Sequence, residues 1–423
     1  MRPVNDLQEL IRLNDGCSNE IERINLVTDC VLQMSSDMLD SFNFDPFSQV
    51  YKTQIKAWLQ EITGRSGYDP QRDEQASFLH EELSVQNYTP NFYKTGDSAF
   101  VGDILQSFGA VLKALAVKAG DSVLEYGPGD GQLCLNLARM GCAVTAVDIE
   151  ARYLSLIDRQ ASAFNLDIRT INGEFGASDT GKKYDRILFF EAFHHAFEHQ
   201  DLVRALRPKL ADNGIIVFAG EPIISVDSYY RRILPYPWGP RLDGLSLIAM
   251  RSYGWCELGF QQEYFIDLLM RAGFIVNFRP EPATDRGNSY LAKAHGDKIE
   301  FGQDFLLESN GLPGCWHQGE GGQRWSRAPV AGIPIDRAQG WREATLELCN
   351  HHPMDQLLEI HHDGGIDVLT VASGATCSYT FPVSNSGEAL RLKCPVHCPK
   401  TLNPESKDTR SLGIAITTLH YRK

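Results

Sequence analysis

One short stretch of the chain, residues 121–131, contains the end of a strand, a glycine-rich turn and the start of a helix. Val123 and Leu124 are apolar, and they lead within two residues into three glycines spaced as Gly-x-Gly-x-Gly. This order is typical of a buried strand that ends in a tight turn. Leu133 and Leu137 then recur at helical spacing, which predicts an amphipathic helix packed on the strand. Strand, glycine turn and helix together form half of a nucleotide-binding site.

An acidic residue, Glu125, precedes the first glycine, Gly127, by two positions. In the dinucleotide fingerprint the glycines cradle a pyrophosphate, which a carboxylate just ahead of them would repel. The acid and the spacing therefore disfavour a nicotinamide oxidoreductase, and they suit a ligand with a cationic centre or a free amine. The stretch resembles the first motif of the class I S-adenosylmethionine-dependent methyltransferases. The resemblance implies an enzyme that uses S-adenosyl-L-methionine as its cofactor.

Strands and helices alternate around this stretch, which predicts an α/β fold: a doubly wound, mostly parallel sheet of the Rossmann-like methyltransferase type. The expected helices are 98–117, 153–164, 202–210 and 261–272, and the expected strands after the first are 143–147, 168–171, 184–190 and 215–219, closed by an antiparallel hairpin of 274–278 and 289–294.

Ligands on such sheets bind at the carboxyl ends of the strands, which directs attention to the residues there. Asp148 ends the second strand, where its carboxylate could accept hydrogen bonds from ribose hydroxyls or cap the next helix. Glu174 is either a group near the adenine, with Phe175 beside the ring, or a simple turn acid. The resemblance implies that Glu125 orients the amino-acid end of the cofactor and that Gly127 and Gly129 bring backbone amides to it. The predicted cofactor residues are Glu125, Gly127, Gly129, Asp148, Ile149, Glu174, Phe175 and Glu191.

The segment 191–195, Glu-Ala-Phe-His-His, begins at the end of the fourth strand and holds the best catalytic candidates. Methyl transfer to a hydroxyl requires that the acceptor be aligned and lose its proton, and histidine titrates in the useful range. We predict His195, or else His194, as the base, with Glu221 holding the base or the acceptor. Packing histidines are one alternative. A divalent metal is another, with ligands among Glu191, His194, His195, Glu198 and His199, although we predict no metal.

The 423 residues suggest two or three domains. We expect an N-terminal helical subdomain or lid over 1–97, a methyltransferase domain over 98–295 and a C-terminal domain over 296–423. Apolar residues from Ile24 to Met38 predict one long helix face, packed in a subdomain or forming a coiled-coil seam, and Ile55, Leu59 and Ile62 predict a helix that Gly64 ends. The aromatic residues of the following connector, Tyr88, Phe92 and Tyr93, are either anchors or part of a lid.

The insertion 222–260, rich in Pro, Tyr, Trp and Arg, should cover the acceptor side of the pocket. Beyond it, short strands at 345–349, 357–360, 367–371, 390–396 and 412–418 predict an antiparallel, jelly-roll-like β-sandwich. Segments 323–326 and 408–415 resemble a module of bacterial surface-polysaccharide assembly enzymes. Three tryptophans there, Trp316, Trp325 and Trp341, could stack on sugars or pack in the core. A group of two cysteines and one histidine, Cys394, His397 and Cys398, is a weak zinc candidate.

The net charge of −14 argues against nucleic acid as the main partner. The chain has no run of 18 apolar residues and no apolar leader, and its ten scattered cysteines suggest reduced thiols, so we expect no transmembrane segment and a cytoplasmic location. The leading hypothesis is an O-methyltransferase acting on a sugar hydroxyl in bacterial surface-glycan biosynthesis. The partners would be a sugar or glycan acceptor, with docking to a glycan-assembly enzyme or a homodimer as further options. A small-molecule methyltransferase of secondary metabolism and a non-catalytic glycan-binding scaffold are the alternatives.

Overall fold

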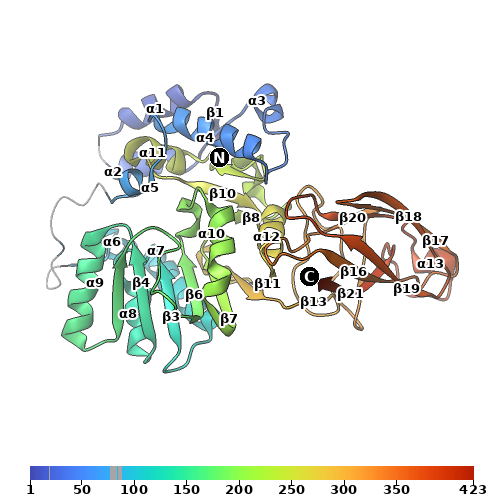
Figure 1. Ribbon diagram of the computed structural model, residues 1–423. Coiled ribbons are helices and arrows are strands. Elements are labelled where there is room, and N and C mark those ends of the chain that lie inside the picture. Colours follow the sequence, from blue (N-terminus) through green and yellow to red (C-terminus); the bar gives the residue numbers. More distant parts are fainter. Residues whose placement is uncertain (19, 77–82, 84–87) are drawn as a thin grey trace. The chain divides into compact units, whose positions relative to one another are not determined.

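A computed structural model describes residues 1–18, 20–76, 83 and 88–423 (Figure 1). The chain forms two compact units. One comprises residues 1–261 and 279–291, and the other comprises 262–278 and 292–423. This division differs from the three expected domains, because the N-terminal residues belong to the same unit as the glycine turn and residues 262–278 belong with the C-terminal strands. The boundary passes through the two strands of the expected hairpin.

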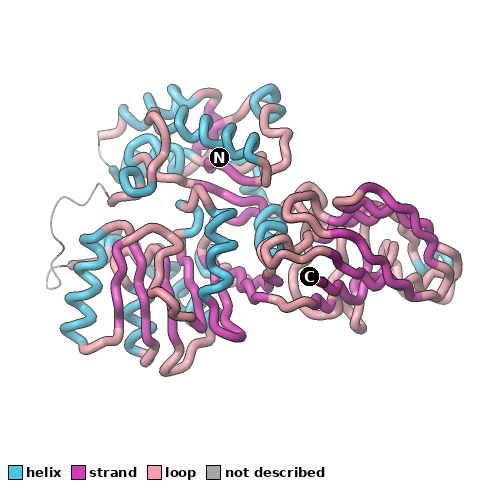
Figure 2. The backbone as a smooth tube through the Cα atoms, in the orientation of Figure 1, coloured by secondary structure: helices cyan, strands magenta, loops and turns pink. Residues whose placement is uncertain are grey.

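The first unit contains five parallel strands in the order β7-β6-β3-β4-β5, which extend to a seven-stranded sheet with β12 and β11 beyond β7 (Figure 2). Their nearness to the predicted ranges confirms the alternating pattern. The strands are β3 (Ser122–Tyr126), β4 (Ala143–Asp148), β5 (Ile168–Asn172), β6 (Tyr184–Phe190), β7 (Leu210–Ala219), β11 (Phe274–Arg279) and β12 (Ser289–Ala294). The helices between them are α8 (Gln132–Arg139), α9 (Ala151–Phe164) and α10 (His199–Leu206), with the short turns η1 (Phe193–His195), η2 (Arg207–Lys209) and η4 (Asp285–Gly287).

One face of this sheet is covered by α7 (Ser98–Leu115), α8 and α9, whose apolar residues share a core with Val123 and Val144. On the other face, Tyr126, Phe189 and Phe218 stack on one another, with ring centroids 5.0 and 5.4 Å apart. By length and composition α7 could also cross a membrane, which is weak evidence because apolar core helices meet the same criterion.

The N-terminal residues and the insertion fold together within the first unit. The insertion supplies a three-stranded sheet, β8-β10-β9, and α11, which packs against α4. The elements are β1 (Arg2–Val4), α1 (Leu7–Asp15), α2 (Glu20–Val27), β2 (Cys30–Leu32), α3 (Ser36–Asp40), α4 (Gln49–Thr63), α5 (Pro70–Asp73), α6 (Asn91–Lys94), β8 (Ile223–Ile224), η3 (Tyr229–Ile233), β9 (Trp238–Pro240), α11 (Gly244–Tyr253) and β10 (Leu258–Gln261).

The long helix expected between Ile24 and Met38 is wrong, and with it the coiled-coil seam. The middle of that stretch is β2, which pairs in parallel with β1, and the backbone N–H of Leu32 donates to the carbonyl oxygen of Leu242 at 2.8 Å. The apolar spacing is therefore that of a buried strand between two short helices. The next prediction is confirmed: α4 ends at Gly64, which has a left-handed backbone with φ of 68°.

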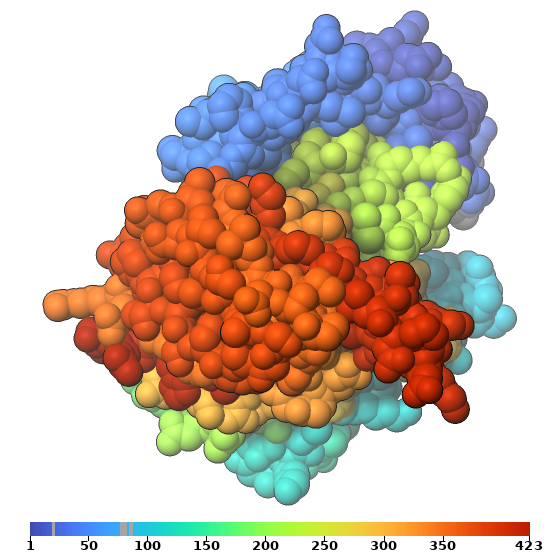
Figure 3. Space-filling view, turned by 90° about the vertical axis from the view of Figure 1, so that its right-hand side faces the viewer, coloured from blue at the N-terminus to red at the C-terminus, as the bar shows by residue number. Residues whose placement is uncertain are grey.

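The second unit, whose C-terminal residues are orange to red in the space-filling view of Figure 3, contains two antiparallel sheets around one core, as a sandwich requires. The jelly-roll topology stays a prediction. Ile266 and Met270 of α12 (Gln262–Arg271) belong to this core. One sheet has the order β13-β21-β16-β19 with β14 beside β21, and the other has the order β15-β20-β17-β18. The elements are β13 (Lys298–Glu300), β14 (Arg324–Trp325), β15 (Val330–Ile333), β16 (Glu343–Cys349), β17 (Gln356–His362), β18 (Gly365–Val371), β19 (Thr376–Pro382), β20 (Leu390–Lys393), α13 (Pro399–Leu402) and β21 (Ala415–Arg422).

The tryptophans of this unit mainly pack. Trp316 and Trp325 are buried, and Trp316 Nε1 donates to the carbonyl oxygen of Gly332 at 2.8 Å, which leaves neither ring free to stack on a sugar. Cys394 is buried beside Ser326, whereas Cys398 lies near the carbonyl oxygen of Asp408. Among the described residues these cysteines form no group with metal-ligand spacing, so the weak zinc prediction has no support.

Candidate active site

The glycine turn after β3 requires its glycines. Gly127 and Gly129 have φ of 66° and 52°, in the left-handed region that side chains avoid. A Cβ on Gly127 would lie 2.8 Å from the Cβ of Ala192 and 3.6 Å from the ring of Phe175. The backbone N–H of Gly129 donates to Asp148 Oδ2 at 3.2 Å, so the turn is fastened to the end of β4.

A cavity of about 370 Å³ opens beside this turn, within the first unit. Its size lies in the range of small-molecule sites. Seven of the eight predicted cofactor residues line it: Gly127, Gly129, Asp148, Ile149, Glu174, Phe175 and Glu191. The strand ends bring these residues together because parallel strands end at the same edge of the sheet.

The eighth residue, Glu125, lies on β3 and does not line the cavity. Its side chain is buried, and its Oε2 has no hydrogen-bond partner among the described residues. Burial, together with the nearby Asp130 and Asp148, raises the pKa of Glu125 to about 8. A buried carboxyl group without a partner fits a ligand that carries positive charge, as S-adenosylmethionine does.

Glu191 has an unusual backbone for its residue type, with φ of 49°. Such strain persists only where the surroundings hold it, and it is common at functional sites. The Glu191 N–H donates to the carbonyl oxygen of Ala219 at 3.0 Å, and its side chain forms an ion pair with Arg286. Burial raises the pKa of Glu191, and Arg286 opposes the rise.

Glu221 clamps the turn that follows β6. Its carboxylate accepts from the backbone N–H groups of Ala192 and Phe193 at 2.9 and 2.8 Å, and from that of His194 at 3.1 Å. His194 Nδ1 lies 2.8 Å from Glu221 Oε2. Burial would raise the pKa of Glu221, but His194 and the backbone donors lower it. Glu221 therefore holds a histidine, as one of the two predicted roles requires, and neither Glu221 nor His194 lines the cavity.

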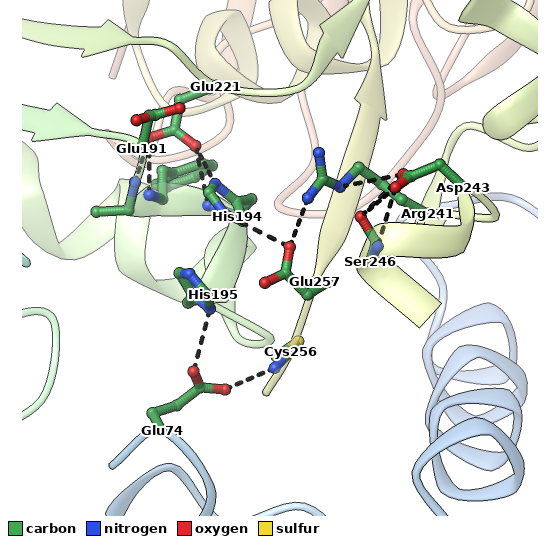
Figure 4. A network of polar contacts seen from close by, with 12 residues as sticks. Glu74, Glu191, His194, His195, Glu221, Arg241, Asp243, Ser246, Cys256 and Glu257 are labelled. Atoms are coloured by element: carbon green, nitrogen blue, oxygen red, sulfur yellow. Dashed lines mark hydrogen bonds and ion pairs between the residues drawn. The ribbon is translucent and has the colours of Figure 1, made fainter. Parts of the chain in front are cut away.

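His195 does line the cavity, as do Gly127 and Gly129 of the glycine turn. Its Nδ1 lies 3.1 Å from Oε2 of Glu74, a residue of the connector after α5 (Figure 4). Burial alone would lower the pKa of His195, but the charge of Glu74, followed by Glu257 and Glu221, outweighs burial and raises it to about 9. Of the two predicted bases, His195 is the one with access to a ligand.

The residues that could bind a metal ion differ from those predicted. His194, His195 and Glu257 offer ligand atoms within 4.8 Å of one another. Of the other predicted ligands, His199 is fully buried, 4.5 Å from the ring of Trp238, and burial lowers its pKa to about 3. Glu198 pairs with Lys52. The Glu257 carboxylate already contacts Arg241 Nη2 at 2.5 Å, and although burial opposes it, Arg241 lowers the pKa of Glu257 to about 2.

Several residues of the cavity were not predicted. Glu74 and Tyr68 come from the connector, and Trp255 comes from the insertion. The insertion therefore reaches the cavity through Trp255, while its place on the acceptor side stays a prediction. A lone acid in a polar connector carries no sequence signal. None of the three connector aromatics lines the cavity, and their role as a lid stays a prediction. Phe92 packs against Tyr93 with ring centroids 4.3 Å apart, and the Tyr88 hydroxyl donates to Asp130 of the glycine turn.

A family model described as a methyltransferase domain matches residues 99–274. The demethylmenaquinone methyltransferase of Tropheryma whipplei (strain Twist) is 30% identical over 174 residues, which cover 39% of this chain and 71% of the relative. The mitochondrial ubiquinone biosynthesis O-methyltransferase of Schizosaccharomyces pombe is 28% identical over 104 residues, or 24% of this chain and 38% of that one. The crystal structure of 1,6-didemethyltoxoflavin-N1-methyltransferase from Burkholderia thailandensis aligns with a TM-score of 0.34 and 16% identity, over 52% of this chain and 94% of that one. The chain belongs to the class I S-adenosylmethionine-dependent methyltransferases, and S-adenosylmethionine is its methyl donor.

Proposed function

We propose that the protein is an O-methyltransferase and that its acceptor is a hydroxyl group. The observation that carries the proposal is His195, an imidazole that lines the same cavity as Gly127 and Asp148. A hydroxyl must lose its proton as it is methylated, and a basic group within the cavity serves that step. Bound S-adenosylmethionine supplies a methyl group on a positively charged sulfur, which the acceptor oxygen takes.

The protein's own residues divide the work between two halves of the cavity. Gly127, Gly129, Asp148 and Glu174 would hold the cofactor. His195 would take the acceptor proton and pass it to solvent, and Trp255 and Tyr68 would cover the acceptor from the other side. Exclusion of water and alignment of the reacting atoms are the main contributions of such walls.

We infer a sugar hydroxyl as the acceptor, in surface-glycan biosynthesis as the C-terminal resemblance implies. Aromatic rings next to carboxylates suit sugars, and the lining of the cavity includes Trp255 and Tyr68 as well as Glu74 and Glu198. The second candidate is a ring hydroxyl of a quinone precursor. The names of the relatives, which include several ubiquinone biosynthesis O-methyltransferases, favour it.

The test is a transfer assay with S-adenosylmethionine labelled in the methyl group. Nucleotide sugars and lipid-linked glycans form one set of acceptors, and catechols and quinols form the other. We expect the label on oxygen, in products of the first set. We also expect His195→Gln to lose transfer while its affinity for S-adenosylhomocysteine stays unchanged. Label only in the second set would select the ring hydroxyl, and label on nitrogen or carbon would refute O-methylation.

A further inference from the structure

Glu74 is held in the active site by contacts from three separate segments. Its Oε1 accepts from the Tyr68 hydroxyl at 2.7 Å and from the Cys256 N–H at 2.8 Å. Its Oε2 lies 3.1 Å from His195 Nδ1, at ion-pair distance, and this buried Nδ1 has no hydrogen bond of good geometry to any described residue. We propose that Glu74 is the positioning residue of the base: it fixes the ring of His195 with Nδ1 turned to the carboxylate and Nε2 left for the acceptor hydroxyl. This inference rests on the proposed function and deepens it.

The short helix α5 carries Glu74 to this place and is itself firmly anchored. Asp69 caps the helix by accepting from the backbone N–H of Gln71 at 2.9 Å. The buried Asp73 accepts from Arg65 Nη1 at 2.6 Å and from Arg72 Nε at 2.8 Å. A carboxylate at the end of so well-fixed a helix can hold a partner in one orientation, because little freedom is left to it.

The same helix also reaches the cofactor half of the cavity. Gln71 Nε2 donates to Glu174 Oε1 at 2.9 Å, and Glu174 is the residue expected near the adenine. One turn of chain therefore contacts both a predicted cofactor residue, through Gln71, and the proposed base, through Glu74. Placement of the base and the shape of the cofactor site depend on the same four-residue helix.

The position of the Glu74 carboxylate affects which ring nitrogen of His195 carries the proton. A carboxylate at Nδ1 stabilises the tautomer with its proton on that nitrogen, so that Nε2 has a free lone pair once the ring is neutral. The acceptor hydroxyl would give its proton to Nε2 and keep the electron pair of its O–H bond for the new bond to the methyl carbon, while the bond between that carbon and the donor sulfur would break with its electron pair left on sulfur. The carboxylate then stabilises the imidazolium until the proton leaves to solvent, as in other carboxylate–histidine pairs.

The charged groups around His195 favour a proton over a metal ion. Glu74 and Glu257 face it from the connector and the insertion, and Glu221 and His194 from the core of the unit. The guanidinium of Arg241 already occupies the carboxylate of Glu257, so a divalent ion bound to that carboxylate would lie next to a fixed positive charge. A protonated His195 between Glu74 and Glu257 balances the negative charge of the carboxylates without a metal ion.

The experiment is an NMR titration of the histidine rings in isotope-labelled protein. Comparison with His195→Gln assigns the signal of His195 among the 12 histidines. We expect His195 to titrate near pH 9 in the parent protein. In Glu74→Gln its midpoint should fall by about one pH unit or more, the effect of removing an opposite charge at contact distance. Glu61→Gln, an exposed carboxylate on α4, is the matched control and should leave the midpoint unchanged.

A kinetic readout separates positioning from a merely structural role. In Glu74→Gln the alkaline plateau of kcat should fall by at least about tenfold and the rising limb of the pH profile should move to lower pH. A structural defect would lower the plateau without moving the limb. Glu74→Asp, which keeps the charge, should restore part of both, while the Kd for S-adenosylhomocysteine stays constant throughout.

An unchanged His195 midpoint in Glu74→Gln overturns the inference. If that variant does not fold, Glu74→Ala, which also removes the charge, decides, and a midpoint unmoved in it has the same meaning. Specific broadening of the His194 and His195 signals by micromolar Zn²⁺ would show a metal site instead and would also overturn it. The titration needs no acceptor, so a shifted midpoint without any hydroxyl methylation would refute the proposed function and leave the Glu74–His195 pair intact.

Discussion

Glu125 is the residue at which ligand binding and stability oppose each other most clearly. It is buried, and burial raises its pKa to about 8, above its ordinary value of 4.5. The folded state therefore holds the proton more tightly than the unfolded state, and this group makes the protein less stable as pH rises from about 4.5 to 8. Below that window the group is neutral in both states and costs little.

Replacing Glu125 by Gln removes the titration. We expect the ligand-free variant to be more stable than the parent by at least about 1 kcal/mol at pH 9, with a much smaller gain at pH 5, because only the ionised carboxylate is costly to bury. The stabilisation by S-adenosylhomocysteine should decrease in the same variant. Urea unfolding at the two pH values, with and without ligand, measures both effects, and a gain that is equal at pH 5 and pH 9 would contradict this assignment.

At the scale of elements, the glycines of α7 differ from those of the cofactor turn. A Cβ on Gly102 or Gly109, inside the helix, would meet no atom within 4 Å. By contrast, Gly131 at the start of α8 has φ of 84°, and a Cβ there would lie 2.6 Å from Ile157 Cγ1. The first two glycines are therefore free to change, and the third is required by its conformation and its neighbour.

Gly102→Ala and Gly109→Ala should each stabilise the protein by about 0.5–1 kcal/mol, because alanine restricts the unfolded chain and favours the helix. Gly131→Ala should destabilise it and weaken binding of S-adenosylhomocysteine. The free energies of unfolding in urea test this contrast. A destabilising effect at Gly102 or Gly109 would mean that the exposed side of α7 is covered by something that the structure does not include.

The elements that the sequence predicted well share a physical origin. β6 and β12 have the predicted bounds. In β6 the reason is a buried apolar run that includes Ile187 and Phe189, residues with strong β preference. The cofactor residues could be predicted because they follow strand ends, whose positions a parallel sheet determines. Glu74, Trp255 and Glu257 could not, since they reach the site through a connector and an insertion without periodic pattern. The long helix between Ile24 and Met38 was predicted wrongly because Val31, a buried strand residue, fits helical spacing by chance.

At the scale of the whole molecule, the division into units changes what a truncation would do. The expected domain border near His295 would separate α12 from the C-terminal strands, although Ile266 and Met270 of that helix belong to the same core as Ile299 and Leu346. Cutting there exposes apolar surface that the full chain buries, which costs stability and favours association.

We therefore expect a fragment of residues 1–295 to be less stable than the full chain and to self-associate. Thermal unfolding and size-exclusion chromatography of the fragment and the full protein measure these effects. A monomeric fragment with the melting temperature of the full chain would show that α12 folds independently of the C-terminal sandwich.

In the proposed reaction His195 accepts the proton of a hydroxyl beside the methyl donor. The pH dependence of kcat at saturating S-adenosylmethionine, measured in the parent protein and in His195→Gln with an acceptor from the labelled assay, tests this role. Because the pKa of His195 is raised to about 9, the parent rate should rise with the neutral fraction of the ring, reach half its maximum near pH 9 and level off only above about pH 10. His195→Gln should be slower by about 100-fold or more and lose this rise. A variant with the parent's rate, or a parent profile that is flat between pH 6 and 9, would contradict the claim.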